Sequence, residues 1–401
     1  MAINKKGVFE TLAHKISNID SNSSTSDIID TLKAVKKADH NTIVSYDSDG
    51  ALPTASASNY RLAYVTNVGQ LRFNNGLQWD KLQTQLPSKA PVQYSLAGTT
   101  FGYIAGGQYP TGNNMIQKFS FTSDGNASDV ADLTVARGRM SGTSSSEHGY
   151  IAGGQEPANS NVVDRFTFAT EGNAVDVGDL LYTVESTASH SDGNFGYISG
   201  GSGSPLGVYI GLTQRFPFAS TITTADIGNF SSNNIQRHAG VSSTTHGYTM
   251  GGKPSPGHGD EIHKFDFSSS ITSSDIGNLT QTRQELAGAS SSTHGYAMGG
   301  YHVSPSPNQT NNIWNTIDKV SFSSDGDATD VGDLPAQGGY YRQRSGNANE
   351  STTNGYYSGG IPNAVREMSK FPFASDANAT DIGDLVSPQG AMDGAANMNG
   401  R

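Results

Sequence analysis

Short stretches in which apolar side chains alternate between two faces recur between Gly102 and Gly360. In the segment from Gly102 to Gly107, Tyr103 and Ala105 alternate with Ile104, and a glycine pair follows. Period-two alternation predicts a β-strand, and the glycine pair predicts a turn that ends it. Six segments share this pattern, with starting positions 47, 47, 51, 48 and 60 residues apart; they begin at Gly102, Gly149, Gly196, Gly247, Gly295 and Gly355.

Two further motifs follow each of these segments in a fixed order. An aromatic–x–aromatic motif, which places two apolar rings on one face of a strand, begins at Phe119, Phe166, Phe216, Phe265, Val320 and Phe371. A motif of the form DVGDL begins at Asp129, Asp176, Asp226, Asp275, Asp330 and Asp381 and predicts a short outer strand. Val177 and Leu180 are its expected core anchors in the second repeat. A stretch rich in small residues precedes each Gly-Tyr segment and suits a strand crowded around an axis. The sequence therefore predicts four strands per repeat and six repeats, a six-bladed β-propeller.

The Gly-Tyr-x-x-Gly-Gly strand resembles the hallmark of the kelch repeat. Arg139, Arg237, Arg283 and Arg344 precede the first strand of their repeats, as the kelch layout implies. Two departures stand out, because the kelch tryptophan is missing and the third repeat lacks the arginine. The resemblance covers residues 92–401 and implies an all-β, kelch-like propeller over 91–401. We expect the C-terminal stretch from Val386 to Ala395 to complete the first blade beside Phe101–Ala105, with the segment from Tyr94 to Thr100 as the competing strand.

Residues 1–45 differ in character and predict a helical anchoring segment. Two apolar stripes have helical spacing and are the candidate anchoring residues: Val8, Phe9, Leu12, Ile16, Ile28 and Leu32. The lysines near the end of the second stripe complement the helix dipole. The two helices either pack on each other or on the propeller, or they anchor the protein to a partner.

Residues 46–90 predict a small β-meander and linker, with Asn75-Gly76 as a hairpin turn. This meander resembles a β module of bacteriophage fibre and virion proteins, and the stretch from Lys5 to Ser17 resembles the openings of structural proteins from cyanophages. The resemblance implies a virion protein of the tail, neck or baseplate region that displays the propeller. The fibre resemblance also implies a homo-oligomer, although the sequence has no heptad run to support one.

Composition removes several other classes of function. The net charge is −11 and no basic run is present, which disfavours nucleic-acid binding. There is no cysteine, which excludes disulfides, cysteine-based zinc sites and a cysteine nucleophile. No apolar run approaches the ~20 residues of a membrane span, and no signal peptide is recognisable. We expect assembly in the host cytoplasm and a final location in the virion.

Catalytic and metal-binding patterns are weak. Asp124, Asp129 and Asp132 recur as Asp325, Asp330 and Asp333, so we assign them to turns rather than to catalysis. His148, His246 and His294 recur before Gly-Tyr and indicate a shared structural role. We therefore expect no enzyme, no cofactor and no metal.

The variable loops after the double glycines are the expected binding surface. The candidate binding residues in them are Tyr109, Tyr209, His258, Tyr301, His302 and Trp314. For Trp314, packing over its own blade is the favoured role. The expected function is a phage tail or fibre component that contacts proteins or the host surface. The alternatives are a glycan- or receptor-binding adhesin, a polysaccharide hydrolase, and a cellular kelch adaptor, the last disfavoured because no partner domain is present.

Overall fold

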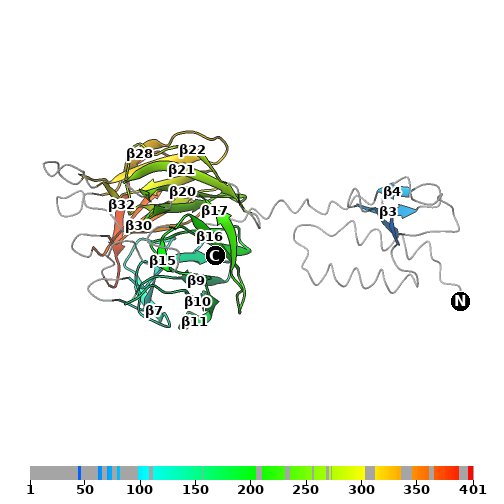
Figure 1. Cartoon of the computed structure of the whole chain (residues 1–401), viewed down its shortest axis with the longest axis horizontal. Coiled ribbons are helices and arrows are strands. Elements are labelled where there is room, and N and C mark those ends of the chain that lie inside the picture. The colour runs from blue at the N-terminus through cyan, green and yellow to red at the C-terminus, as the bar shows by residue number, and fades with distance from the viewer. Residues whose placement is uncertain are drawn as a thin grey trace. The chain divides into compact units, whose positions relative to one another are not determined.

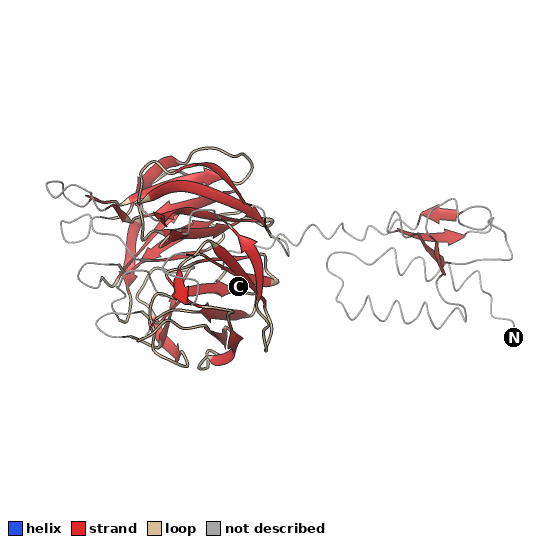
Figure 2. Ribbon diagram, in the orientation of Figure 1, coloured by secondary structure: helices blue, strands red, loops and turns tan. Residues whose placement is uncertain are grey.

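The structure, a computed structural model, divides into a first unit, Met1–Gln93, and a second unit, Tyr94–Arg401. It describes residues 98–107, 112–155, 157–204, 210–230, 235–254, 257–267, 271, 273–302, 312–335, 346–360 and 365–387. It also describes the backbone of the strands at 44–46, 62–65, 70–74, 79–81 and 396–400. No helix occurs in these residues, and every regular element is a strand (Figure 2). Accordingly, none of them forms a helix that could span a membrane.

The described part of the first unit is one four-stranded sheet. Its strands are β1 (Val44–Tyr46), β2 (Leu62–Val65), β3 (Gln70–Asn74) and β4 (Trp79–Lys81), in that order across the sheet. β1 pairs in parallel with β2, whereas β2, β3 and β4 form an antiparallel meander. The helices expected over 1–45, with all six candidate anchoring residues, lie outside the described residues.

The second unit is built on six antiparallel sheets, the blades, each with four main strands (Figure 1). Two short two-stranded sheets accompany them: β12 (Thr183–Glu185) with β15 (Ser202–Ser204), and β25 (Tyr301–His302) with β26 (Asn312–Ile313). Blade 1 holds β33 (Ala396–Gly400), β5 (Phe101–Ala105), β6 (Met115–Ser120) and β7 (Ser128–Asp132); blade 2 holds β8 (Ser141–Ser144), β9 (His148–Ala152), β10 (Val162–Thr167) and β11 (Val175–Asp179); blade 3 holds β13 (Ala188–Ser191), β14 (Phe195–Ser199), β16 (Leu212–Pro217) and β17 (Ala225–Asn229). Blade 4 holds β19 (Ala239–Ser242), β20 (His246–Pro254), β21 (Gly259–Asp266) and β22 (Ser273–Asn278), with β18 (Ile235–Gln236) added to β20; blade 5 holds β23 (Ala287–Ser290), β24 (His294–Met298), β27 (Thr316–Ser321) and β28 (Thr329–Asp333); blade 6 holds β29 (Asn347–Glu350), β30 (Asn354–Ser358), β31 (Glu367–Pro372) and β32 (Thr380–Asp384).

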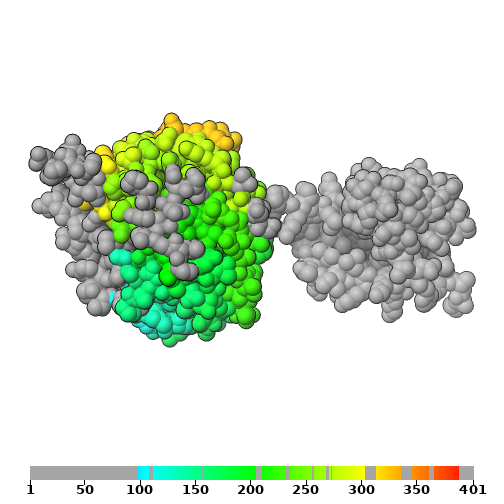
Figure 3. Space-filling model, viewed as in Figure 1, coloured from blue at the N-terminus to red at the C-terminus, as the bar shows by residue number. Residues whose placement is uncertain are grey.

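The first strand of each blade contacts the first strands of both neighbouring blades, so β33, β8, β13, β19, β23 and β29 form a closed inner ring. In the space-filling view, the described surface grades from cyan through green to yellow and orange (Figure 3). The predicted six-bladed propeller is confirmed.

The C-terminal end of the chain closes this ring. β33 pairs antiparallel with β5, from Ala396 opposite Ala105 to Gly400 opposite Phe101. Closure by the C-terminal end of the chain is therefore confirmed, but the predicted residues were wrong, because the closing strand Ala396–Gly400 begins just after the predicted stretch ends at Ala395. The competing segment contributes a bridge between Gly98 and Ser351 of blade 6 instead.

Small residues on the inner strands are a packing requirement. A Cβ atom built on Gly288 would lie 2.4 Å from the carbonyl oxygen of Gly240, and one on Gly240 would lie 2.6 Å from that of Ser189. Neighbouring inner strands thus approach too closely for a side chain at Gly240 and Gly288, and the equivalent positions in blades 3 and 6 hold the small residues Ser189 and Ala348, as the sequence predicts.

Aromatic stacking joins every blade to the next one. The tyrosine of each Gly-Tyr segment lies over the second ring of the following blade's aromatic motif, with ring centroids 4.6–5.0 Å apart. The six pairs are Tyr103–Phe168, Tyr150–Phe218, Tyr197–Phe267, Tyr248–Phe322, Tyr296–Phe373 and Tyr356–Phe121. The last pair joins blade 6 to blade 1, so the two ends of the repeat array are held by the same contact as the other blades.

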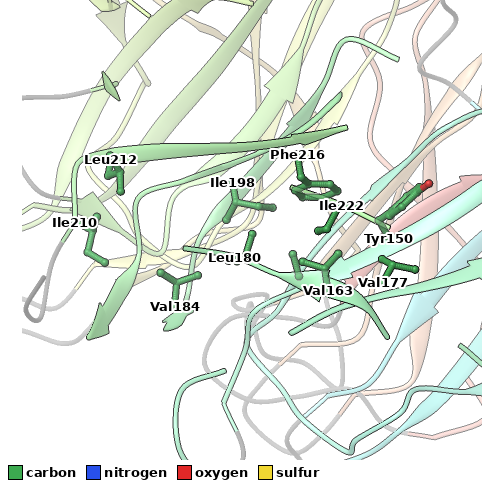
Figure 4. Close-up of a cluster of buried hydrophobic side chains, with 11 residues drawn as sticks. Tyr150, Val163, Val177, Leu180, Val184, Ile198, Ile210, Leu212, Phe216 and Ile222 are labelled. Atoms are coloured by element: carbon green, nitrogen blue, oxygen red, sulfur yellow. The ribbon is translucent and has the colours of Figure 1, made fainter. Parts of the chain in front are cut away.

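The outer strands carry the predicted DVGDL motif, and its residues have separate roles. Val177 and Leu180 are 5% and 2% exposed, which confirms them as core anchors; they pack between blades 2 and 3 with Val163, Ile198 and Ile222 (Figure 4). The first aspartate shapes a bulge. The side chain of Asp176, for example, accepts a hydrogen bond from the backbone N–H of Gly178, whose φ is 138°. A side chain at that glycine would be strained, so the aspartate and the glycine together fix the local backbone of the outer strand.

The arginines before the inner strands occupy two different positions, whereas the sequence groups them as one. Arg283 is fully buried and pairs with Asp318 at 2.9 Å, and Arg137 pairs in the same way with Asp164 at 3.2 Å. Arg139 and Arg237 lie elsewhere, exactly ten residues before their Gly-Tyr segments. Arg344 lies outside the described residues.

Candidate functional site

The propeller has two unlike faces, which follow from the strand order. On one face, the first strand of each blade begins and the second strand ends at its double glycine. We call this the loop face, because the variable loops leave the blades there. The opposite face, the turn face, carries the short connections between first and second strands and between third and fourth strands. All six double glycines have positive φ at both residues, for example 66° and 103° at Gly153 and Gly154. Because only glycine adopts such angles readily, each loop leaves its blade through the same turn.

The turn face is built from repeated contacts between blades. Lys118, Lys264, Lys319 and Lys370 on third strands form salt bridges to Glu171, Asp325, Asp376 and Asp124 of the next blade. Asp124 and Asp325 thus belong to a structural series, in keeping with their predicted assignment to turns. His246 and His294 also belong to this face, where each Nδ1 lies 2.8 Å from the hydroxyl of the preceding threonine.

The axial channel opens on the loop face through a ring of strained residues. Arg139, Ser186, Arg237 and Glu285 hold equivalent positions, each with φ between 58° and 60°, which is unusual for residues other than glycine. Their backbones are joined in sequence, since the N–H groups of Ser186, Arg237 and Glu285 donate to the carbonyl of the preceding member at 2.8–3.1 Å. The ring therefore fixes the spacing of blades 2 to 5 at the channel mouth.

Two ion pairs flank this mouth. Arg237 binds Glu285 at 2.9 Å, and Arg139 binds Glu185 at 2.7 Å. Below them lies a polar cavity of about 140 Å³, lined largely by serine, threonine, alanine and glycine of the inner strands. At about 30 Å³ for each water molecule, this volume suits a few waters rather than a large ligand. The channel mouth was not predicted from the sequence. The feature that could have indicated it is the charged residue ten positions before Gly-Tyr in three repeats: Arg139, Arg237 and Glu285.

A cluster of aromatic rings from two blades lies on the loop face. His258 belongs to the loop between β20 and β21 of blade 4, and its ring lies 4.7 Å from that of His302 and 6.3 Å from that of Tyr301. These two residues form β25 (Tyr301–His302) in blade 5, which pairs with β26 (Asn312–Ile313). Burial, and the neighbouring charges of His302 and Lys253, lower the pKa of His258, which keeps this ring neutral near pH 7. The structure therefore brings together three of the six candidate binding residues.

Tyr301 supports the cluster rather than facing solvent. It is 7% exposed, and its backbone exchanges two hydrogen bonds with Gln284, which directly precedes Glu285 at the channel mouth. His258 and His302 are only partly buried. The cluster and the channel mouth are thus neighbours through Gln284, and the two histidines offer the accessible surface.

The other candidate binding residues have different positions. Trp314 follows β26, its backbone N–H donates to the carbonyl of Gly300 at 2.9 Å, and its indole Nε1 is buried. The residue as a whole is partly buried, and its packing over the blade stays a prediction. Tyr109 and Tyr209 lie outside the described residues. Among the described residues, no group of three histidine, cysteine, aspartate or glutamate side chains is arranged to hold a metal ion.

Comparison with known proteins supports the architecture. No protein-family model matches the chain, and no curated protein matches its sequence. A solved structure entitled "Structure of YjhT" is similar to it, with a TM-score of 0.56 and 11% identity over 73% of this chain and 98% of that chain. At this identity the similarity shows the fold alone. A propeller of this kind is compatible with a protein- or glycan-binding role.

Proposed function

We propose that this chain is a structural protein of a bacteriophage virion, in the tail or a fibre, and that it binds a protein or glycan of the host surface through its loop face. The observation that carries the binding role is the cluster of His258, Tyr301 and His302, in which two blades contribute side chains to one place. Loops on a rigid scaffold are where binding residues concentrate in proteins.

The difference between the two faces supports this proposal. The turn face repeats similar contacts from blade to blade, as a surface selected for packing does. The loop face combines uniform glycine turns with loops of different length and sequence. A binding function that depends on varied side chains is therefore expected on the loop face.

The virion location rests on the resemblance of the first 83 residues to phage structural proteins. In this proposal, Val8, Phe9, Leu12, Ile16, Ile28 and Leu32 contact other virion proteins of the tail, neck or baseplate. A cryo-EM map of the intact particle tests the location. Absence of the chain from the particle would contradict it, as would a first unit that touches no other virion protein.

We further propose that the propeller binds without catalysing hydrolysis. Two acids, Glu285 and Glu350, line the axial channel. They lie at opposite ends of adjacent inner strands, because Glu285 precedes β23 and Glu350 ends β29. Glu350 corresponds to Ser290 of β23, five residues after Glu285. At about 3.3 Å per residue, roughly 17 Å separates them along the strands, beyond the ~5–9.5 Å of paired glycosidase carboxylates. Glu285 is also bound to Arg237.

Binding of the labelled full-length chain to an array of bacterial surface polysaccharides, and to envelopes of marine cyanobacteria, tests the binding role. We expect His302→Ala and His258→Ala to weaken binding at least tenfold. His294→Asn is the matched control on the turn face, because Asn354 holds the equivalent position in blade 6. Equal binding by all variants would contradict the assignment of the site, and release of reducing sugar during incubation would contradict the absence of catalysis.

A further inference from the structure

The interface between blades 3 and 4, which we call the histidine interface, differs from the other interfaces of the ring. Three buried histidines lie in it: His190, His238 and His263, which are 2%, 4% and 8% exposed. No other histidine among the described residues is classed as buried. Three separate positions of the repeat have thus acquired histidine at one interface only.

Each of the three rings spans the two blades. His190 of blade 3 packs edge-on against Phe265 of blade 4 at 5.0 Å, and its Nδ1 lies 3.1 Å from the carbonyl oxygen of Val241. His238 of blade 4 stacks on Phe230 at the end of blade 3, with centroids 5.2 Å apart. It lies so close to blade 3 that a Cβ on Gly200 would be 2.5 Å from its Cε1 atom.

His263 of blade 4 completes the group, edge-on to the same Phe230 at 6.2 Å. The charged and titratable groups around the cluster are few. Glu261 lies 3.4 Å from His263, and Asp275 is its cross-strand neighbour, with an oxygen already bound by the backbone of Gly277. His190 and His263 are the titratable groups that act on His238, and Arg237 beside it is bound to Glu285.

The equivalent positions at other interfaces hold groups that do not titrate near neutral pH. Met140, Thr187 and Leu286 stand where His238 stands, and Thr143, Val241 and Ala289 stand where His190 stands. At two interfaces, the buried pairs Arg137–Asp164 and Arg283–Asp318 occupy the positions of Ile235 and His263. The histidine interface therefore lacks this ion pair and holds an isoleucine and an imidazole ring at these two positions instead.

We propose that the histidine interface is an acid-sensitive seam of the propeller, where protonation of His190 and His238 separates blades 3 and 4 while the other interfaces stay closed. One side of each ring packs on an aromatic side chain, Phe265 or Phe230, and the other side borders the polar channel cavity. Both rings are nonetheless almost fully buried, so an imidazolium there would be a cation without bulk solvation, and opening of the interface to water would favour it.

The direction of the effect follows from the pKa values. Burial lowers the pKa of His190 to about 4 and that of His238 to about 3, from 6.5 in water. In the closed interface, His190 and His238 therefore bind no proton at pH 5, whereas in the open interface each of these two rings binds one. Opening takes up protons and is favoured as the pH falls below 6.5. By linkage, acidification from pH 7.5 to 5 increases the opening equilibrium about thirtyfold for each histidine that becomes hydrated.

The absence of cysteine from the chain gives a clean probe. Ile271 of blade 4 packs on Gly228 of blade 3 and donates its N–H to the carbonyl of Ile227; Ile222 of blade 3 packs on Gly178 of blade 2 and donates to Val177. Both isoleucines are 8% exposed. The variants Ile271→Cys and Ile222→Cys therefore report on two interfaces from equivalent positions.

The full-length variants are labelled with 4,4′-dithiodipyridine at pH 7.5 and pH 5, and each rate is divided by that of glutathione under the same conditions. We expect the protection of the thiol at position 271 to fall at least tenfold at pH 5, and that at position 222 to change less than twofold. We expect the thiol at position 271 to stay protected at pH 5 when His190→Thr and His238→Leu are added to Ile271→Cys. Threonine and leucine occur at the equivalent positions of other blades, at Thr143 and Leu286.

Three results would overturn the proposal: an equal loss at both positions, which indicates global unfolding; no loss at position 271; or a loss that persists in the double-histidine variant. If a cysteine variant does not fold, hydrogen exchange of the unmodified chain replaces it. The amides of Ile271 and Ile222, corrected for the intrinsic effect of pH, are then compared with the same expected outcomes.

Discussion

The turn face and the loop face of the propeller are made by the same strands but obey different constraints. On the turn face, tyrosines stack on the next blade and lysines pair with acids across four of the blade boundaries, so these side chains have partners in the neighbouring repeat. On the loop face, the glycine turns and the channel mouth recur, whereas the His258–His302 contact joins one pair of blades. Repeated contacts thus mark residues that close the ring, and departure from the repeat among the accessible side chains of the loop face marks residues available for binding.

The comparison predicts that substitutions in the interfaces between blades change stability and leave binding intact, with the reverse on the loop face. The largest effect is expected for Phe216→Ala. This ring is fully buried and contacts Tyr150 and Phe218 of the cluster between blades 2 and 3 (Figure 4). The cavity should lower the free energy of unfolding by about 3–5 kcal/mol, measured by urea denaturation. A loss below 1 kcal/mol would show that the interface is not the core that the burial indicates.

Removing one partner of a buried ion pair should cost nearly as much. Arg283→Met leaves Asp318 buried without its cation, and we expect a loss of about 3–5 kcal/mol in the free energy of unfolding. The double variant Arg283→Ile, Asp318→Gln should recover most of this loss, because Ile235 and Gln214 hold the equivalent positions in other blades. A double variant as unstable as the single one would contradict the account.

Acid should weaken the fold through His190 and His238. Since the folded protein holds both rings neutral down to about pH 4 and pH 3, their contribution is present in full above pH 6.5 and falls as the pH drops below it. The slope approaches about 1.4 kcal/mol per pH unit for each ring. Thermal unfolding between pH 7.5 and 5 measures it, with His190→Thr, His238→Leu as the flatter comparison and His294→Asn as the control. Parallel profiles for all three proteins would refute the assignment.

The exposed salt bridges of the turn face should contribute little individually. Lys370 and Asp124 join blade 6 to blade 1, but their side chains are 31% and 56% exposed. We expect Lys370→Ala to lower the free energy of unfolding by at most about 1 kcal/mol, and by less in 1 M salt. A larger, salt-insensitive loss would mean that this contact is essential to ring closure.

The smallest change in stability is expected on the loop face. His302→Ala removes a partly buried ring that packs on His258 and should change the unfolding free energy by less than about 0.5 kcal/mol. The same variant should lose binding to surface polysaccharide or envelopes. Loss of stability with unchanged binding would reverse the roles that we assign to the two faces.

Much of the fold could be predicted from the sequence because the same local motifs occur in each of the six repeats. Period-two alternation, glycine pairs and paired aromatics each fix a strand or a turn within about ten residues. The candidate site was predictable in part: the loop containing His258 and the loop containing Tyr301 and His302 were identified separately. The contact between these loops was not predictable, because it depends on which blades are adjacent and on the conformations of the loops. Arg139 and Arg283 were grouped for a similar reason, since a shift of two residues relative to Gly-Tyr separates a channel mouth from a buried ion pair.

The amino-acid sequence by itself determined the number of blades, the four strands in each and the small side chains at the axis, because these are local patterns repeated along the chain. Only the tertiary structure decided which side chains meet across blades: the tyrosine–phenylalanine stacks, the two kinds of arginine and the gathering of His190, His238 and His263 at one interface. The physical reason is that burial and charge act between residues close in space. Side chains some fifty residues apart in the sequence interact only when the folded ring brings neighbouring blades together.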